Sequence, residues 1–398
     1  MTGAAQLLDL GDPEVVADPY PHLAALRSHA PFAWHEGLGR HVATGHAEVS
    51  AVLRDRGLGR VYRTREPEAD WATFNWLHAD SLLDSEPPKH TRLRRLVAGA
   101  FARGHVARLE PRVAAIAAEL VAGASGPPFD LVADVAEPLP VTVIAELLDW
   151  PEAERHRLRP WSQAIVAMYE VAPTAAQQAA ARAACAEFAE HVAALADERA
   201  RHPGEDLLSD LVAARDDGEG GDGGRLSRRE LVATVVLLPN AGHEASVNAL
   251  GNGIHSWLAA GAPPVDVTDD VALAAFVEEL LRHDSPLHLF ERTATRDVTI
   301  AGHRVAQGEH VVALLGAANR DPAVFERPDV FDPARTPNPH VAFGLGTHFC
   351  VGAPLARVEL RQAVRALLTA HPRLDVVSVS RRPTFVLRGL RELVLAPA

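Results

Sequence analysis

The chain has very little cysteine, since only Cys185 and Cys350 occur among its 398 residues. Two cysteines cannot build a disulfide framework, and their scarcity favours a reducing compartment. An iron–sulfur cluster normally needs four thiolates and a structural zinc site two to four closely spaced ones, so both are excluded. The chain therefore depends on an ordinary hydrophobic core, to which 47% of its residues can contribute.

Long apolar runs and a basic N-terminal region are also missing. No window approaches the roughly 18 uninterrupted apolar residues that a membrane-spanning helix requires. The N-terminal stretch carries acids at Asp9, Asp12 and Glu14 instead of the basic residues with which a secretory signal begins. We expect a cytoplasmic protein with no membrane partner.

Positive charge is in deficit: 39 basic residues face 52 acidic ones, which gives a formal net charge of −13. A nucleic-acid-binding protein needs a concentrated basic face to neutralise phosphates. Nucleic acid is therefore not expected as a partner.

Helical patterns occupy most of the chain. Residues 109–120 and 175–196 show apolar spacings of three and four, which predict helices. Strand patterns are few and far apart, at residues 32–44, 298–315 and 384–395. This distribution predicts a mostly α (α+β) fold in which small β-sheets lie beside a large helical region.

A long helix with an unusual middle is predicted in the second half of the chain. Residues 216–224 (DDGEGGDGG) before it are expected to form a solvated loop. Ser227 and Glu230 form a capping-box pair from which the helix runs towards Leu258. Pro239 and Gly242 interrupt it, and a buried helix commonly keeps such a flaw for packing or for a site.

The most informative segment, residues 343–354 (FGLGTHFCVGAP), surrounds one cysteine with three glycines. Glycines let the backbone run close to a flat ligand, and Pro354 is predicted to open a helix. The N-terminus of that helix favours a thiolate at Cys350. Cys350 is therefore a candidate nucleophile or metal ligand.

This segment resembles the haem-binding signature of the cytochrome P450 family, Phe-x-x-Gly-x-His-x-Cys-x-Gly. The matching residues are Phe343, Gly346, His348, Cys350 and Gly352. The resemblance implies that Cys350 is the axial thiolate ligand of a haem b iron and that Gly352 belongs to the cofactor-binding loop. It also implies a single cytochrome P450 domain over residues 1–398.

A second landmark supports this resemblance. Glu279 and Arg282 lie three residues apart and thus on one helix face, where an isolated reading would be a surface ion pair. In the family this Glu-x-x-Arg forms a buried network with a later arginine, to which Arg335 corresponds. The resemblance implies that these residues support the fold and do not take part in catalysis.

The resemblance further implies cations for the two haem propionates. The candidates are His90, Arg94, Arg292 and His348. Taken singly, each would be read as a solvated or capping residue. As a set they are similar to the family's propionate-binding residues, since charge-assisted hydrogen bonds fix an anion in position.

Residues 241–246 (AGHEAS) resemble the family's oxygen-binding segment, so Glu244, Ala245 and Ser246 are the candidate catalytic positions. The family has an acid followed by threonine, whereas here Ala245 follows Glu244. Ser246 lies one residue on, about 100° around the helix. We therefore expect proton delivery to use water fixed by the substrate, with little contribution from Ser246.

The resemblance implies a haem-thiolate monooxygenase that inserts one atom of O2 into a small or mid-sized organic substrate, a natural product or a xenobiotic. Electrons are expected from a ferredoxin and a ferredoxin reductase, docking near Arg357 and Arg361. The residues expected to line the substrate pocket are 71–78, Met168, Tyr169, Leu238, Ala241, 287–290 and 384–386.

Two alternatives stay open. One is a haem protein that does not oxygenate, such as an isomerase, a dehydratase or a sensor, for which Ala245 would be harmless. The other is a thiol enzyme without haem, in which Cys350 is the nucleophile and His348 the base.

Overall fold

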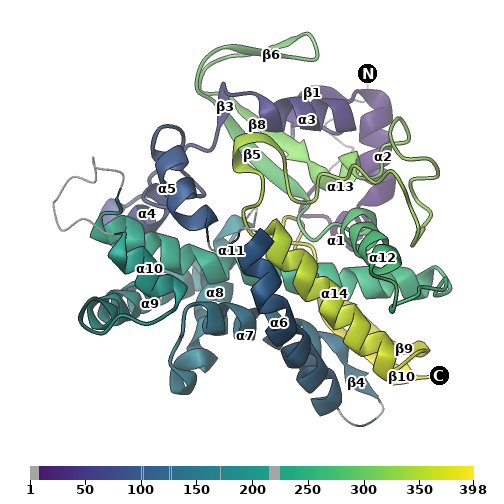
Figure 1. Ribbon diagram of the computed structural model, residues 1–398. Coiled ribbons are helices and arrows are strands. Elements are labelled where there is room, and N and C mark those ends of the chain that lie inside the picture. Colours follow the sequence, from purple (N-terminus) through teal and green to yellow (C-terminus); the bar gives the residue numbers. More distant parts are fainter. Residues whose placement is uncertain are drawn as a thin grey trace. The chain divides into compact units, whose positions relative to one another are not determined.

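Helices form most of the chain in the computed structural model (Figure 1), which describes residues 9–99, 101, 103–124, 126, 128–170, 172–214 and 225–398 but not the side chains of 103–105. The chain divides into two compact units. The first takes its described residues from 1–59, 117–136 and 245–398, and the second from 60–116 and 137–244. Helices α6 (Arg103–Gly123) and α11 (Arg228–Ala259) contribute residues to both.

The β-structure of the described residues lies mainly in the first unit. One five-stranded sheet has the order β1-β2-β8-β5-β3, a three-stranded sheet the order β4-β10-β9, and β6 pairs with β7. The strands are β1 (Phe32–His35), β2 (Arg40–Ala43), β3 (Leu58–Gly59), β4 (Phe129–Asp130), β5 (Leu289–Ala294), β6 (Val298–Ile300), β7 (His303–Val305), β8 (His310–Leu314), β9 (Leu374–Arg381) and β10 (Leu390–Pro397).

The five-stranded sheet separates two small hydrophobic cores. Alternate residues of a strand point to opposite faces. Val311 and Ala313 of β8 accordingly join one cluster, whereas Val312 and Leu314 join the other. The first unit is thus built on both faces of this sheet.

The helices of the first unit, besides its parts of α6 and α11, cover these sheets. They are α1 (Pro13–Ala17), α2 (Tyr20–His29), α3 (His46–Arg54), α12 (Asp270–His283), α13 (Leu315–Ala318) and α14 (Ala353–Ala370), with the short helices η2 (Val132–Ala136) and η5 (Gly346–His348).

The secondary structure of the second unit's described residues consists of helices. They form α4 (Glu68–Ala79), α5 (Lys89–Ala98), α7 (Pro138–Leu147), α8 (Arg155–Val166), α9 (Ala175–Arg201) and α10 (Leu207–Ala213), with η3 (Glu152–Glu154) and η4 (Ala167–Tyr169). The long α9 packs against α4, α8 and α10. A capping box at Thr174 and Gln177 starts α9, and Cys185 is buried in its middle.

The predicted start of the central helix is confirmed. Glu230 N–H donates to Ser227 Oγ at 3.2 Å, and Ser227 N–H donates to Glu230 Oε2 at 3.0 Å. Helix α11 then continues through Pro239 to Ala259. The loop predicted at residues 216–224 lies outside the described residues.

The prediction of a mostly α fold with small sheets is confirmed, as are the strands predicted within 32–44 and 298–315. The strand predicted over 384–395 is wrong at its start, because β10 begins at Leu390 and a separate strand, β9, precedes it. Tertiary contacts shape the intervening residues: Leu387 forms an isolated bridge with Leu287, and Arg388 bonds to Asp284. The single domain over 1–398 stays a prediction.

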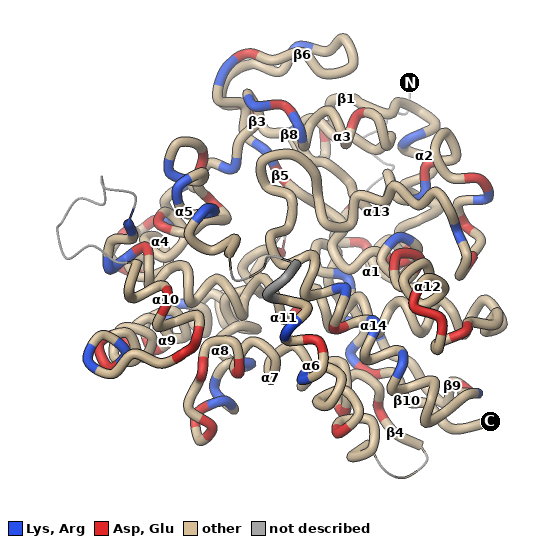
Figure 2. The backbone as a smooth tube through the Cα atoms, in the orientation of Figure 1, with Lys and Arg blue, Asp and Glu red and all other residues tan. Residues whose placement is uncertain are grey.

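Basic and acidic residues are interspersed along the described chain (Figure 2). None of its described helices combines the length and the hydropathy that crossing a bilayer requires.

Candidate functional site

Cys350 lies in a tight loop between η5 and α14, and its side chain is exposed. Its N–H donates to the carbonyl of Phe343 at 3.0 Å, which closes the loop. Helix α14 begins three residues later at Ala353, as Pro354 predicted. The sulfur is therefore presented to solvent just before a helix N-terminus, where the helix dipole stabilises a thiolate.

Two glycines fix the course of this loop. Gly346 has a φ of 71°, a conformation that favours glycine, and a Cβ there would lie 2.5 Å from the carbonyl oxygen of Leu53 in α3. At Gly352 a Cβ would lie 3.9 Å from Cys350 Sγ. The loop thus packs closely on α3. Because Gly352 has no side chain, the space beside the sulfur stays open, which suits a flat ligand such as haem.

The first unit also buries a cation on the strand next to this loop. Arg292 of β5 is 2% exposed, and its guanidinium lies 5.3 Å from the ring centroid of Phe290. Its Nη1 donates to the carbonyl of Glu291 at 2.9 Å. Arg292 thus places a buried guanidinium, a group suited to binding carboxylates, on β5.

The predicted site residues divide between the two units. The second unit holds His90, Arg94 and Glu244, and the first holds Ala245, Ser246, Arg292, His348, Cys350 and Gly352. His90 and Arg94 lie one turn apart on α5, with His90 buried and Arg94 half-buried. Glu244 is buried, and its Oε2 lies 3.9 Å from Nδ1 of His243.

Ser246 has a partner that sequence reasoning missed. Its hydroxyl lies beside Glu359, a buried carboxyl on α14. Burial raises the pKa of Glu359 to about 8, and the hydroxyl of Ser246 opposes that rise. Glu359 therefore holds its proton near neutral pH, and Ser246 is directed at α14.

A signal for Glu359 was present in the sequence. The residue lies between Val358 and Leu360 on a helix whose apolar positions include Leu355, Val358 and Leu367. An acid on an apolar helix face is costly to bury in charged form, so it is expected either to be protonated or to be paired.

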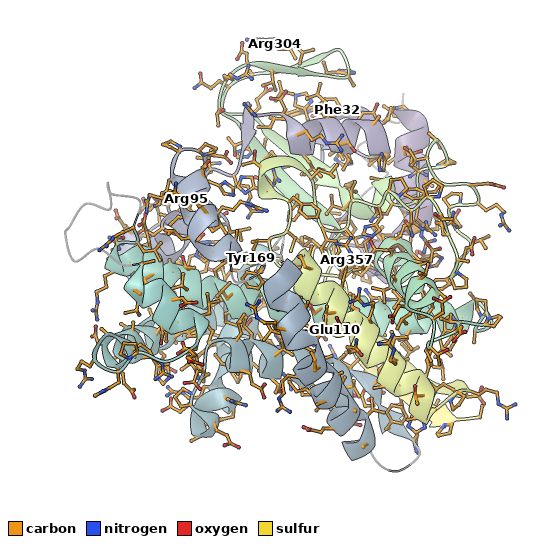
Figure 3. The ribbon with its side chains drawn as sticks, viewed as in Figure 1. Phe32, Arg95, Glu110, Tyr169, Arg304 and Arg357 are labelled. Atoms are coloured by element: carbon orange, nitrogen blue, oxygen red, sulfur yellow. The ribbon has the colours of Figure 1, made fainter. Side chains whose placement is uncertain are left out.

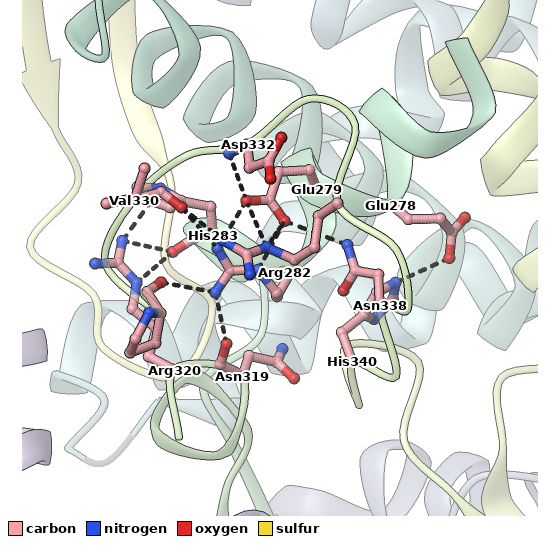
Figure 4. Close-up of polar contacts among 12 residues, drawn as sticks. Glu278, Glu279, Arg282, His283, Asn319, Arg320, Val330, Asp332, Asn338 and His340 are labelled. Carbon is pink, nitrogen blue, oxygen red and sulfur yellow. Dashed lines mark hydrogen bonds and ion pairs between the residues drawn. The ribbon is translucent and has the colours of Figure 1, made fainter. Parts of the chain in front are cut away.

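The predicted scaffold around Glu279 is confirmed (Figure 4). Arg282 donates twice to its carboxylate, at 2.7 Å each, and Arg335 Nε lies 3.1 Å from Oε2. Asp332 N–H and Asn338 Nδ2 complete the set at 2.9 and 3.2 Å. Burial alone would raise the pKa of Glu279, but hydrogen bonds from Arg282 hold it below its ordinary value.

Known proteins resemble this chain over nearly its whole length. Residues 269–383 match the family described as Cytochrome P450. Nocardicin C N-oxygenase of Nocardia uniformis subsp. tsuyamanensis is 40% identical over 373 residues, which cover 92% of this chain and 90% of that protein. The monooxygenase PikC of Streptomyces venezuelae is 37% identical over 406 residues, covering 98% and 94%.

Solved structures share the fold. The crystal structure of P450BioI in complex with hexadec-9Z-enoic acid ligated acyl carrier protein matches with a TM-score of 0.90 at 31% identity. The match covers 96% of this chain and 99% of that one. The crystal structure of CalO2 matches with a TM-score of 0.87 at 32% identity, covering 98% of each.

Removing the Glu279 carboxylate is expected to prevent folding. The Glu279→Ala variant leaves Arg282 and Arg335 as buried cations without their anion, at a cost of about 3–5 kcal/mol. Circular dichroism and thermal unfolding of the purified variant measure this loss. A variant that unfolds at the wild-type temperature would contradict the scaffold role.

Glu359 is expected to make stability fall as the pH rises. Its pKa of about 8 in the folded chain exceeds the ordinary 4.5, so the folded state binds the extra proton between these values. The contribution of this proton to the free energy of unfolding is complete below pH 4.5 and is lost as the pH rises through 8. One pKa unit corresponds to about 1.4 kcal/mol, so the loss amounts to a few kcal/mol.

Thermal unfolding of wild type and Glu359→Gln between about pH 6 and about pH 9 tests this expectation. The glutamine variant should lose less stability over that range, because it has no proton to release. Ser246→Ala should go on losing stability to a higher pH than wild type, because it removes the hydroxyl that lowers the pKa of Glu359 in the folded state. Parallel curves for wild type and Glu359→Gln would refute the assignment.

Proposed function

The chain belongs to the cytochrome P450 family, and on that premise we propose that Cys350 is the residue that binds the haem iron. The family's cofactor is haem b with an axial thiolate. Cys185 is unsuited to that task, because it is buried in α9 and burial raises the pKa of its thiol to about 12. The exposed position of Cys350 at the start of α14 is the observation that carries the assignment.

The protein is a monooxygenase that inserts one atom of O2 into an organic substrate. When bound, haem supplies O2 activation, and a thiolate ligand favours cleavage of the O–O bond. The chain's own residues hold the cofactor, position the substrate and move protons. Membership of this family argues against the alternative of a thiol enzyme without haem. The hydroxylases among the relatives favour an oxygenating enzyme over a haem protein that does not oxygenate.

His90, Arg94, Arg292 and His348 are the proposed ligands of the propionates. Arginine guanidinium groups bind carboxylates through two parallel hydrogen bonds, which fixes both position and orientation. The complete burial of Arg292 supports its inclusion, since a desolvated cation gains most from an anionic ligand. Gly352 is proposed to leave room for the ligand beside the sulfur.

Glu244, Ala245 and Ser246 form the proposed site of proton delivery. Ala245 has no hydroxyl, and the hydroxyl of Ser246 lies beside Glu359 of α14. Ser246 is thus poorly placed to act for the missing threonine. The proposed donor path is Glu244 with water that the substrate holds in place.

Enzymes of this family in bacteria generally receive electrons from a redox partner. We assign that task to a ferredoxin served by a ferredoxin reductase. Arg357 contributes less to docking than its sequence position indicates, because it forms a bidentate ion pair with Glu278. Arg361, one turn further along α14, stays a candidate.

The proposed substrate is a small or mid-sized natural product in the cytoplasm. Relatives include a mycinamicin IV hydroxylase/epoxidase and a 6-deoxyerythronolide B hydroxylase, at 38% and 36% identity. In the second unit, His78 of α4 stacks on Phe74 with ring centroids 4.0 Å apart, and Tyr169 of η4 donates to its Nε2 at 3.3 Å. We propose that these residues belong to the wall of the substrate pocket, since such sites are typically apolar with a few polar groups.

Replacing Cys350 by histidine is expected to abolish the thiolate signature. The reduced protein under carbon monoxide should show the band that gives the family its name, because that band requires a thiolate ligand. Cys350→His should lose this band, whereas Cys185→Ala should keep it. Retention of the full band in Cys350→His would disprove the ligand assignment.

Coupling of reductant use to product formation is expected to depend on the substrate. A ligand that fills the pocket without holding the water should divert most electrons to hydrogen peroxide. Ala245→Thr should narrow the difference between such a ligand and a true substrate, because it supplies a hydroxyl beside Glu244. Product and peroxide per reductant consumed measure the effect.

Ser246→Ala serves as the control for this experiment and should change coupling little. If it abolished product formation while substrate binding and haem content stayed unchanged, Ser246 would be the proton donor and the water-based path would be wrong.

A further inference from the structure

We propose that Glu278 is a positioning residue that holds the Cys350 loop in place through Arg357 and His340. The proposal rests on the assignment of Cys350 as the iron ligand. Glu278 lies on α12 beside the scaffold residue Glu279, and its partners stand at the two ends of the segment 340–357, which contains Cys350.

Glu278 holds Arg357 with both carboxylate oxygens. Arg357 Nε donates to Oε1 at 2.6 Å and Nη2 donates to Oε2 at 2.7 Å. This paired geometry fixes orientation as well as distance. Glu278 is half-buried, and although burial alone would raise its pKa, hydrogen bonds from Arg357 and His340 lower that pKa to about 2. The carboxylate thus stays charged throughout the physiological range.

Glu278 also holds the beginning of the loop. His340 Nε2 lies 2.9 Å from Glu278 Oε2, and Figure 4 draws this contact as a dashed line. Ala342 N–H donates to His340 Nδ1 at 3.2 Å. Since Nδ1 accepts from a backbone N–H, Nε2 is the nitrogen that donates to Glu278. The carboxylate and the backbone N–H of Ala342 together fix the position and orientation of His340.

A short chain of contacts leads from Arg357 to the cysteine. The guanidinium of Arg357, at the start of α14 (Figure 3), lies 4.5 Å from the ring centroid of Phe343. The carbonyl of the same Phe343 accepts the hydrogen bond from Cys350 N–H. Glu278 thus acts on Cys350 through one arginine, one ring and one backbone bond, all in the first unit.

The two neighbouring glutamates have separate tasks. Glu279 binds Arg335 and Asn338, which precede the loop, whereas Glu278 binds residues on either side of the cysteine. Loss of Glu278 should therefore loosen residues 341–352 and leave the segment around Arg335 in place. A ligand held by a loosened loop gives a weaker and more variable iron–thiolate bond.

The test compares holoenzyme of wild type, Glu278→Gln and Arg357→Lys. Glutamine keeps the size of Glu278 and removes its charge, whereas lysine keeps the charge of Arg357 and removes its two-pronged geometry. Amide hydrogen exchange over 341–352 should be about tenfold faster in both variants, with exchange around Arg335 unchanged. The thiolate band under carbon monoxide should convert faster to the form that lacks a thiolate.

Arg365→Gln is the matched control. Arg365 forms an ion pair with Asp270 between the same two helices, α14 and α12, but two turns further from the loop. This variant should keep wild-type exchange and the wild-type band. Equal changes in the control and in Glu278→Gln would show a general effect on helix packing and would overturn the proposal.

Wild-type exchange and a stable band in both Glu278→Gln and Arg357→Lys would also overturn it. The two readouts separate this proposal from the ligand assignment. If Cys350 were not the ligand, the variants would exchange faster at 341–352 while the thiolate band stayed stable. If Glu278 did not position the loop, exchange itself would not change.

Discussion

The buried carboxylate of Glu279 is the interaction on which the first unit depends. It is fully buried together with Arg282, and a charge so placed is stable only when its partners satisfy it. Arg282 in turn donates to the carbonyls of Asn319 and Pro328 at 2.8 Å each. One ion pair on α12 therefore fixes the course of the irregular segment around residues 319–328, which forms no β-sheet hydrogen bonds.

Two further carboxylates extend this arrangement from the same region. Glu278 binds the segment around the cysteine, and Asp284, just after α12, binds Arg388 at 2.7 Å. Although burial alone would raise the pKa of Asp284, Arg388 and Arg381 hold it well below its usual range. Arg388 also donates to the carbonyls of Val16 and Ala17, which ties the N-terminal helices to the C-terminal strands. Small sheets bury little surface, so arginine–carboxylate bonds between distant segments supply the specificity of the packing.

The features that could be predicted from the sequence are those determined by residues close together along the chain. The capping box at Ser227, the helix after Pro354 and the glycines around Cys350 each follow from residues within a few positions of one another. Strand β9 was missed because Val376, Val377 and Val379 are exposed, so its residues do not alternate between a buried and a solvated face.

The partners of Glu278 and Glu359 could not be predicted for a related reason. The apolar face of α14 marks Glu359 as unusual, but the residues that contact these two acids lie about 80 and 110 positions away along the chain. On the proposed path the hydroxyl of Ser246, which lies beside Glu359 of α14, does not replace that of the missing threonine. On the proposed path the water must then come with the substrate, so recognition of the substrate and delivery of the proton become one interaction. A substrate that fits poorly would then both bind more weakly and react more slowly. On this path the absence of a threonine at position 245 increases the selectivity of the enzyme.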